Sequence, residues 1–246
     1  KHKSTKFKFG NMNIELVGKI VSQPYINMTL QTMKQFGVEG KWSGSHIEIP
    51  EGKYLHKKVR VESDWSAASY WYEMSALAGQ TPFTMVGLAE NSLQGDSEVR
   101  NIAKKLGVET SFSEKDGLSM TTVVANASSV KHLDYDFNSQ PDIAQTFVVL
   151  CCCLGVTFHF TGLESLKIKE TDRISALINE CRKIGFVLKS NDVDDLAWDG
   201  ETCEPCNEPI ATYKDHRMAM AFAPAALKLG SIRIDDPAVV SKSYPR

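Results

Sequence analysis

One local pattern occurs three times in this chain, and it constrains the fold more than any other sequence feature. In each copy an amphipathic helix with a polar last turn is followed by Gly, an apolar strand, a polar turn and a second strand. The copies span residues 33–50, 103–120 and 181–198. Gly37, Gly107 and Gly185 then stand where a helix ends in a left-handed backbone conformation. The pattern predicts an α/β protein built from similar units.

A second kind of helix alternates with the first. Residues 64–79, 141–155 and 213–230 each carry an Asp at or near the start and then run almost wholly apolar. A helix that is apolar on all sides is expected to be buried on all sides. Short strands at 58–63 and 83–88 are expected between the helices, and the polar, Gly-containing stretch 88–96 is the best candidate for a boundary between lobes.

Charge and length exclude several classes of protein. The chain has 246 residues and a net charge of −2, so no overall basic field indicates nucleic acid or an anionic membrane as partner. The basic residues 1–10 are explained by a frayed end at least as well as by a binding arm. No apolar run approaches the roughly 18 residues that span a bilayer, and no signal peptide is visible. We expect a cytoplasmic protein.

The six cysteines do not resemble a disulfide framework or a metal site. Cys151, Cys152 and Cys153 are adjacent within an apolar segment, which is typical of small buried side chains in a reducing compartment. Cys203 and Cys206 have CxxC spacing, but no second pair or nearby His completes a zinc site. We expect reduced thiols and no metal.

A run of mixed charge precedes the third amphipathic helix. The segment LKIKETDRIS (166–175) carries three cations and two carboxylates within seven positions. Cations at a helix N-terminus are disfavoured by about 0.3–1 kcal/mol each. Either the neighbouring carboxylates neutralise them as exposed pairs, or an anionic ligand is held there by cations and helix N–H groups together.

His216 and Arg217 open an otherwise apolar helix in the same way. A buried helix has no solvated face for Arg217, so this side chain requires a partner. Two cationic helix starts in one chain indicate a shared, multiply charged ligand such as a phosphorylated carboxylic acid. Asp142, in the first turn of another apolar helix, has routine N-terminal capping as its simpler explanation.

These segments resemble those of a known family. IKETDRISALINECRKIG (168–185) and TYKDHRMAM (212–220) closely resemble two signature segments of the 3-phosphoshikimate 1-carboxyvinyltransferases, also called 5-enolpyruvylshikimate-3-phosphate (EPSP) synthases. Residues 21–38, 90–96 and 138–146 are similar to further family segments. The resemblance implies transfer of the enolpyruvyl group of phosphoenolpyruvate to the 5-hydroxyl of shikimate 3-phosphate. It also implies the family's inside-out α/β barrel, in which βαβαββ repeats place helices inside and sheets outside.

The resemblance also implies roles for individual residues. Asp142 matches the base for the 5-hydroxyl, and Glu170 matches the group that exchanges protons at the methylene carbon of phosphoenolpyruvate. Addition across that double bond and the following elimination require proton transfers that two positioned carboxyl groups can supply. The remaining matched positions contact substrate: Ser22, Tyr25 and Lys169 for shikimate 3-phosphate, and Arg173, Arg217 and Lys242 for phosphoenolpyruvate, with His216 beside them. No metal or organic cofactor is implied.

Family members are considerably longer than this chain, and their N-terminal phosphoenolpyruvate contacts have no match in it. We therefore expect residues 1–94 to be a fragment of the N-terminal-side (second) lobe and residues 95–246 to be most of the C-terminal-side (first) lobe. The fragment alone is expected to be inactive, and the full-length protein to be a monomer. Other interpretations are a binding-only or partner-dependent phosphometabolite module, a UDP-N-acetylglucosamine enolpyruvyl transferase, and a repeat protein with no ligand.

Overall fold

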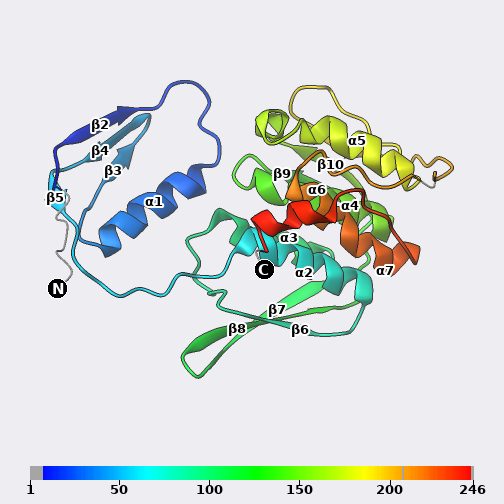
Figure 1. Ribbon diagram of the computed structural model, residues 1–246, viewed down its shortest axis with the longest axis horizontal. Helices are drawn as coiled ribbons and strands as arrows, with labels where there is room; N and C mark the ends of the chain where they lie inside the picture. The colour runs from blue at the N-terminus through cyan, green and yellow to red at the C-terminus, as the bar shows by residue number, and fades with distance from the viewer. Residues whose placement is uncertain (1–7, 207, 245–246) are drawn as a thin grey trace.

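The computed structural model describes residues 8–206 and 208–244, which form two bodies (Figure 1). The smaller body contains residues 8–53 and the larger body residues 65–244, and residues 54–64 cross from one to the other. Most of the basic opening segment, residues 1–7, lies outside the described range. No helix within that range combines the length and hydropathy needed to cross a bilayer.

The smaller body is one helix beside a small antiparallel sheet of strand order β2-β4-β3. Leu30 on the helix, Val38 after it and Ile47 on the central strand are its buried hydrophobic side chains. Two further short strands pair at its edge. The elements are β1 (Lys8–Phe9), β2 (Met12–Glu15), α1 (Gln23–Gln35), β3 (Lys41–Ser43), β4 (His46–Ile49) and β5 (Gly52–Lys53).

The larger body contains a βαβαββ unit from residue 132 to residue 198. Its sheet has the order β11-β10-β9, in which β9 and β10 are parallel and β10 and β11 antiparallel. An isolated bridge between Lys189 and Ala197 stands where the first strand of the final hairpin is expected. The elements are β9 (His132–Asp136), η2 (Pro141–Ile143), α4 (Ala144–Leu154), β10 (Thr157–Thr161), η3 (Glu164–Ile168), α5 (Arg173–Lys183) and β11 (Leu196–Trp198).

A second unit precedes it, with an antiparallel sheet of order β6-β8-β7. Residues 58–63, expected as a strand, pair with no strand of the described chain, and Val61 there is 87% exposed. The elements are α2 (Trp65–Ala78), β6 (Phe83–Val86), η1 (Gly95–Glu98), α3 (Val99–Lys105), β7 (Val108–Lys115) and β8 (Leu118–Ala125).

The C-terminal part of the larger body is helical and more broken than the sequence predicted. Pro224 cannot donate a backbone hydrogen bond, and the helix expected over 213–230 is interrupted around it. The elements are α6 (His216–Phe222), η4 (Ala223–Ala225), α7 (Ala226–Leu229) and η5 (Pro237–Lys242).

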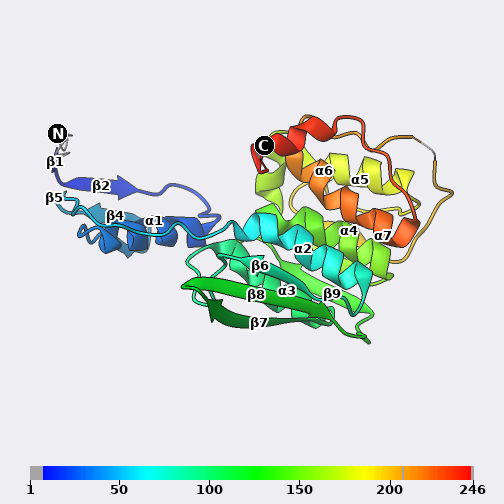
Figure 2. The ribbon, with the colours of Figure 1, turned by 60° about the horizontal axis from the view of Figure 1, so that its bottom comes forward.

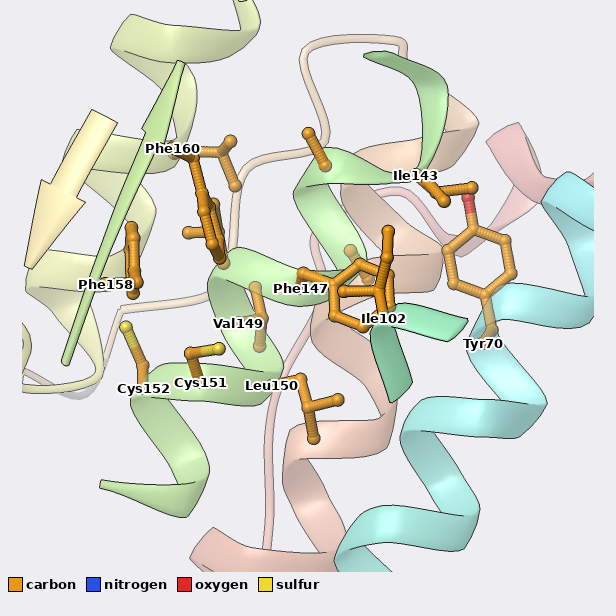
Figure 3. Close-up of a cluster of buried hydrophobic side chains, with 14 of the residues drawn as sticks. Tyr70, Ile102, Ile143, Phe147, Val149, Leu150, Cys151, Cys152, Phe158 and Phe160 are labelled. Carbon is orange, nitrogen blue, oxygen red and sulfur yellow. The ribbon is translucent and has the colours of Figure 1, made fainter. Parts of the chain in front are cut away.

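The helices α2, α4 and α6 pack together inside the larger body, and the sheets lie on its outside (Figure 2). Residues 144–153 of α4 are all buried, and Figure 3 shows its side chains between α2 and the Phe158 and Phe160 rings of β10. The predicted α/β fold with inner helices and outer sheets is confirmed. The prediction of burial on all sides holds for α4 but is wrong for the other two helices, because Trp71 on α2 is 37% exposed and Leu227 on α7 is 54% exposed.

The three repeat glycines adopt the predicted backbone. Gly37, Gly107 and Gly185 have φ of 91°, 91° and 99°, each two residues after the end of an amphipathic helix. At Gly107 an added Cβ would lie 2.5 Å from the backbone oxygen of Asn126, so this position excludes a side chain for steric reasons too.

The predicted lobe boundary at residue 94 differs from the structure. The buried core of the larger body begins at Trp65, and β6 belongs to the same sheet as β7 and β8. The polar stretch 88–96 is a loop held inside this body: Glu62 accepts hydrogen bonds from Ala89 N, Ser92 Oγ and Gln94 Nε2. Its polar residues make these hydrogen bonds. The chain passes from the smaller body to the larger body earlier, at residues 54–64.

Candidate functional site

The two cationic helix starts converge on one carboxylate. Arg173 is the first residue of α5 and Arg217 the second of α6. Arg173 Nη1 lies 3.2 Å from Asp142 Oδ1, and Arg217 Nη2 lies 3.2 Å from Asp142 Oδ2. Arg217 Nη1 also donates to the backbone oxygen of Asp142 at 3.0 Å. The start of η2 and the starts of two helices therefore meet at one point.

Arg173 is held on three sides by acids. Its side chain is 1% exposed; Nη2 lies 2.7 Å from Glu170 Oε2, and Nε lies 2.7 Å from Asp215 Oδ2. Asp215 is fully buried and caps α6 by accepting a hydrogen bond from the backbone N–H of Arg217 at 2.9 Å. One buried carboxylate therefore fixes both the Arg173 guanidinium and the start of the helix that carries Arg217.

Asp142 is ionised because cations outweigh its burial. Burial raises the pKa of a carboxyl group, but Arg217, Lys169 and Arg173 together lower the pKa of Asp142 below its ordinary value. Lys169 Nζ lies 3.3 Å from Asp142 Oδ1. A carboxylate that is charged at neutral pH can accept a proton.

Glu170 lies between two cations at the outer edge of the same cluster. One oxygen pairs with Arg173 and the other with Lys242 Nζ. The hydrogen bond from Lys242 is the main reason that the pKa of Glu170 falls to about 2. Lys242 itself is 61% exposed at the end of η5, so this partner can leave more easily than Arg173.

His216 and Tyr70 border the cluster on its buried side. Burial, followed by the charge of Arg217, lowers the pKa of His216, which favours a neutral imidazole. Tyr70 on α2 lies beside Arg217 and acts on its charge. Burial alone would lower the pKa of Arg217. The neighbouring Tyr70, Asp142 and Asp96 outweigh burial and raise this pKa.

The first turn of α1 brings Ser22 and Tyr25 to this site from the smaller body. Ser22 N donates to the backbone oxygen of Asn138 at 3.0 Å, four residues before Asp142. Burial raises the pKa of Tyr25, and the carboxylates of Asp96 and Asp142 raise it further. All nine residues singled out from the sequence therefore lie in or beside one cluster.

The structure corrects one part of the simpler interpretation, in which neighbouring carboxylates neutralise these cations as exposed pairs. Exposed surface pairing does not describe Arg173, which is almost completely buried. Lys169 and Lys242 are exposed and pair with carboxylates of the cluster, whereas the Lys167 amine reaches the backbone oxygen of Asp192 away from it. The Asp142 carboxylate pairs with Lys169, Arg173 and Arg217.

Sequence reasoning missed Asp215, Tyr70 and Asp96. Asp215 directly precedes His216 and could have been found as the cap of a helix that starts with two cations. Tyr70 and Asp96 had no local signal, because their partners lie far away in the sequence. Among the described residues no group of three or more His, Cys, Asp and Glu side chains is arranged to hold a metal ion.

The fold and the site can be compared with known proteins. An EPSP synthase from Acinetobacter baumannii superimposes with a TM-score of 0.71 at 18% identity, over 96% of this chain and 55% of that one. The enolpyruvyl transferase NikO from Streptomyces tendae gives a TM-score of 0.52 at 14% identity, over 89% of this chain and 49% of that one. These similarities define the fold as that of the enolpyruvyl transferases.

Sequence comparison specifies the family. The family described as EPSP synthase (3-phosphoshikimate 1-carboxyvinyltransferase) matches residues 6–246. A 3-phosphoshikimate 1-carboxyvinyltransferase from Bacteroides fragilis is 50% identical over 95% of this chain and 57% of its own length. One from Idiomarina loihiensis is 34% identical over 96% of this chain and 54% of its own length. The chain belongs to the EPSP synthase family, and it spans little more than half the length of these relatives.

Proposed function

We propose that this chain carries the catalytic carboxylates and part of the anion-binding site of an EPSP synthase. Such an enzyme transfers the enolpyruvyl group of phosphoenolpyruvate to the 5-hydroxyl of shikimate 3-phosphate and releases phosphate. The observation that carries the proposal is the convergence of Arg173 and Arg217 on Asp142, with Glu170 on the far side of Arg173.

The addition step requires one proton to leave an oxygen and one to reach a carbon. Asp142 is ionised and accepts the proton of the 5-hydroxyl as that oxygen bonds to C2 of phosphoenolpyruvate. The methylene carbon receives a proton through Glu170 and becomes a methyl group. The product of this step is a tetrahedral adduct that still carries the phosphate.

The elimination step reverses the proton transfer at carbon only, and the proton taken up by Asp142 passes to the departing phosphate. The C–O bond to phosphate breaks, the methyl group loses a proton to Glu170, and the enolpyruvyl ether is formed. Arg173, Arg217 and Lys242 stabilise the charge on the departing phosphate. When Lys242 turns from Glu170 to the phosphoenolpyruvate anion, the main cause of the low pKa of Glu170 is removed, and Glu170 can then carry a proton.

Binding of shikimate 3-phosphate is assigned to residues from both bodies. Ser22 and Tyr25 come from the first turn of α1, and Lys169 precedes α5. The two bodies meet at Ser22, whose N–H bonds to Asn138. This arrangement supports a substrate site at the junction rather than within either body.

We assign the activity to a protein of the full length seen in the relatives, and not to this chain alone. Because the chain spans 57% of the Bacteroides fragilis relative, we expect it to bind shikimate 3-phosphate without appreciable turnover. We also propose that the longer protein is a cytoplasmic monomer. The family match favours shikimate 3-phosphate over UDP-N-acetylglucosamine as acceptor.

The test is phosphate release from phosphoenolpyruvate and shikimate 3-phosphate, measured with and without the remaining portion of the Bacteroides fragilis relative supplied as a separate chain. Turnover that appears only in the mixture supports a divided enzyme. Calorimetry that shows binding of shikimate 3-phosphate but no turnover in the mixture would support a binding-only module instead. If the mixture shows neither binding of shikimate 3-phosphate nor turnover, the remaining interpretation is a repeat protein without a ligand.

A further inference from the structure

The segment that leads into α6 has an unusual backbone conformation. Tyr213 and Lys214 have φ of 54° and 58°, so two consecutive residues with side chains lie in the left-handed region. Such residues rarely adopt this conformation, and they keep it only where surrounding contacts hold them. Asp215, His216 and Arg217 follow directly. The course of this turn therefore sets where α6 begins and where its Arg217 lies.

A buried acid on α5 holds this turn. Glu180 is 0% exposed and lies about two helical turns after Arg173. Its Oε2 accepts a hydrogen bond from Ala211 N at 2.9 Å, and its Oε1 accepts one from the Tyr213 hydroxyl at 2.7 Å. Lys183 Nζ lies 2.8 Å from Oε2 and forms an ion pair with it. Hydrogen bonds to an ionised group are stronger than those between neutral groups, so Glu180 is a firm anchor.

The turn is held by α5 at both of its ends. At the far end Arg173 Nε lies 2.7 Å from Asp215 Oδ2, and Asp215 caps α6. At the near end Glu180 holds residues 211 and 213. Between them Thr212 N donates to Asp235 Oδ1 at 3.0 Å. Glu180 therefore supplies the side-chain contacts on either side of Thr212, next to the left-handed pair.

We propose that Glu180 is a positioning residue that holds the left-handed pair Tyr213 and Lys214 and thereby keeps Arg217 at the anion site. Glu180 acts through the turn and is not assigned a contact with substrate. A guanidinium group that is already in place loses less freedom when an anion binds. The effect on phosphoenolpyruvate rests on the proposed function, which assigns Arg217 to that substrate. The effect on the turn does not depend on that function.

Hydrogen exchange at the Arg217 amide tests the positioning, because this N–H donates to Asp215 where the turn ends. We expect Glu180→Ala to speed exchange at Arg217 at least about tenfold, equivalent to about 1.4 kcal/mol. The amides of Ala221 in α6 and Val148 in α4 should keep their protection, which shows that both helices stay folded.

A glycine at position 214 makes the test specific to the strained turn. Glycine adopts a positive φ without strain, so E180A/K214G should regain much of the Arg217 protection that E180A loses. Lys214→Gly alone, at an exposed position, should leave this protection unchanged. Val123→Ala, which removes buried volume from the central strand of the β6-β8-β7 sheet, is the control for a general loss of stability. Unchanged Arg217 exchange in E180A, no regain in the double variant, or equal acceleration in V123A would overturn the proposal.

Substrate affinity, measured by calorimetry, is the second readout. We expect E180A to weaken binding of phosphoenolpyruvate about tenfold with shikimate 3-phosphate present, and binding of shikimate 3-phosphate alone to change much less. The residues assigned to shikimate 3-phosphate lie outside the turn, so an equal loss of both affinities would contradict the proposal. If the unaltered chain does not bind phosphoenolpyruvate, the proposed function fails, and exchange at Arg217 still decides the positioning. If the affinity is unchanged although the Arg217 amide has lost its protection, the link between the turn and substrate is wrong.

Discussion

At the scale of single residues, the site depends on carboxylates whose surroundings differ. Asp142 and Glu170 are both kept ionised by cations, whereas Glu73 in α2 is fully buried and neither of its oxygens has a hydrogen-bond partner among the described residues. The three acids are therefore expected to respond differently to substitution and to pH.

Asp142→Asn removes the group assigned as base and keeps its shape. In the mixture with the remaining portion of a relative, we expect kcat for phosphate release to fall about 10²–10⁴-fold with a smaller change in KM. Asp116→Asn, at an exposed turn, should leave kcat unchanged. A loss of similar size at both positions would show that Asp142 has no special role.

Lys242→Ala removes the main cause of the low pKa of Glu170. The pKa of Glu170 should rise from about 2 toward its ordinary value of 4.5, as followed by carbon-13 NMR of the carboxyl group. The ion pair stabilises the fold above pH 4.5, and this stabilisation is lost as pH falls toward 2. A Glu170 pKa that does not move in K242A would contradict the assigned pairing.

Glu73→Gln removes an acid that burial keeps protonated. Burial raises the pKa of Glu73 well above 4.5, so the unfolded chain ionises first as pH rises and stability falls. The variant should therefore gain stability relative to the unaltered chain as pH rises above the unfolded pKa, until the folded Glu73 also ionises. Urea unfolding at pH 4 should show little difference between the two, and at pH 7 a clear one. Glu114→Gln, on an exposed strand, is the control.

At the scale of elements, helix ends were the most predictable features. The glycines after α1, α3 and α5 were identified from sequence because a left-handed residue at a helix end is a local requirement. The break around Pro224 and the missing strand at 58–63 were not anticipated. The pairing of a strand depends on neighbours elsewhere in the chain, which a local pattern does not contain.

Gly107→Ala tests the steric part of a helix end. Gly107 and Gly117 both have positive φ, at 91° and 70°, but only at Gly107 would an added Cβ approach a backbone oxygen, that of Asn126. We expect G117A to cost about 1 kcal/mol from backbone strain alone and G107A to cost at least about 2 kcal/mol. Equal denaturation midpoints for the two variants would remove the steric explanation.

At the scale of the whole molecule, the sequence predicted the class of fold and the meeting of the charged residues but misplaced the boundary between bodies. The stretch 88–96 is polar because Ser92 and Gln94 donate hydrogen bonds to Glu62. These hydrogen bonds join residues that are distant in sequence. Tyr70 escaped notice for the same reason, since its importance depends on which arginine it touches. Residues with a family pattern or a local helix signal could be found, and residues defined only by tertiary contacts could not.

The account depends on Arg173 and Arg217 forming one anion site. Calorimetric titration of this chain with phosphoenolpyruvate, in the presence of shikimate 3-phosphate, tests that claim most directly. We predict saturable binding that Arg217→Ala weakens at least about tenfold, as expected for loss of a charge-assisted contact. Lys189→Ala, which removes an exposed cation paired with Asp199 and Glu201, should leave the affinity unchanged. Equal affinity in all three proteins, or no saturable binding to the unaltered chain, would contradict the account.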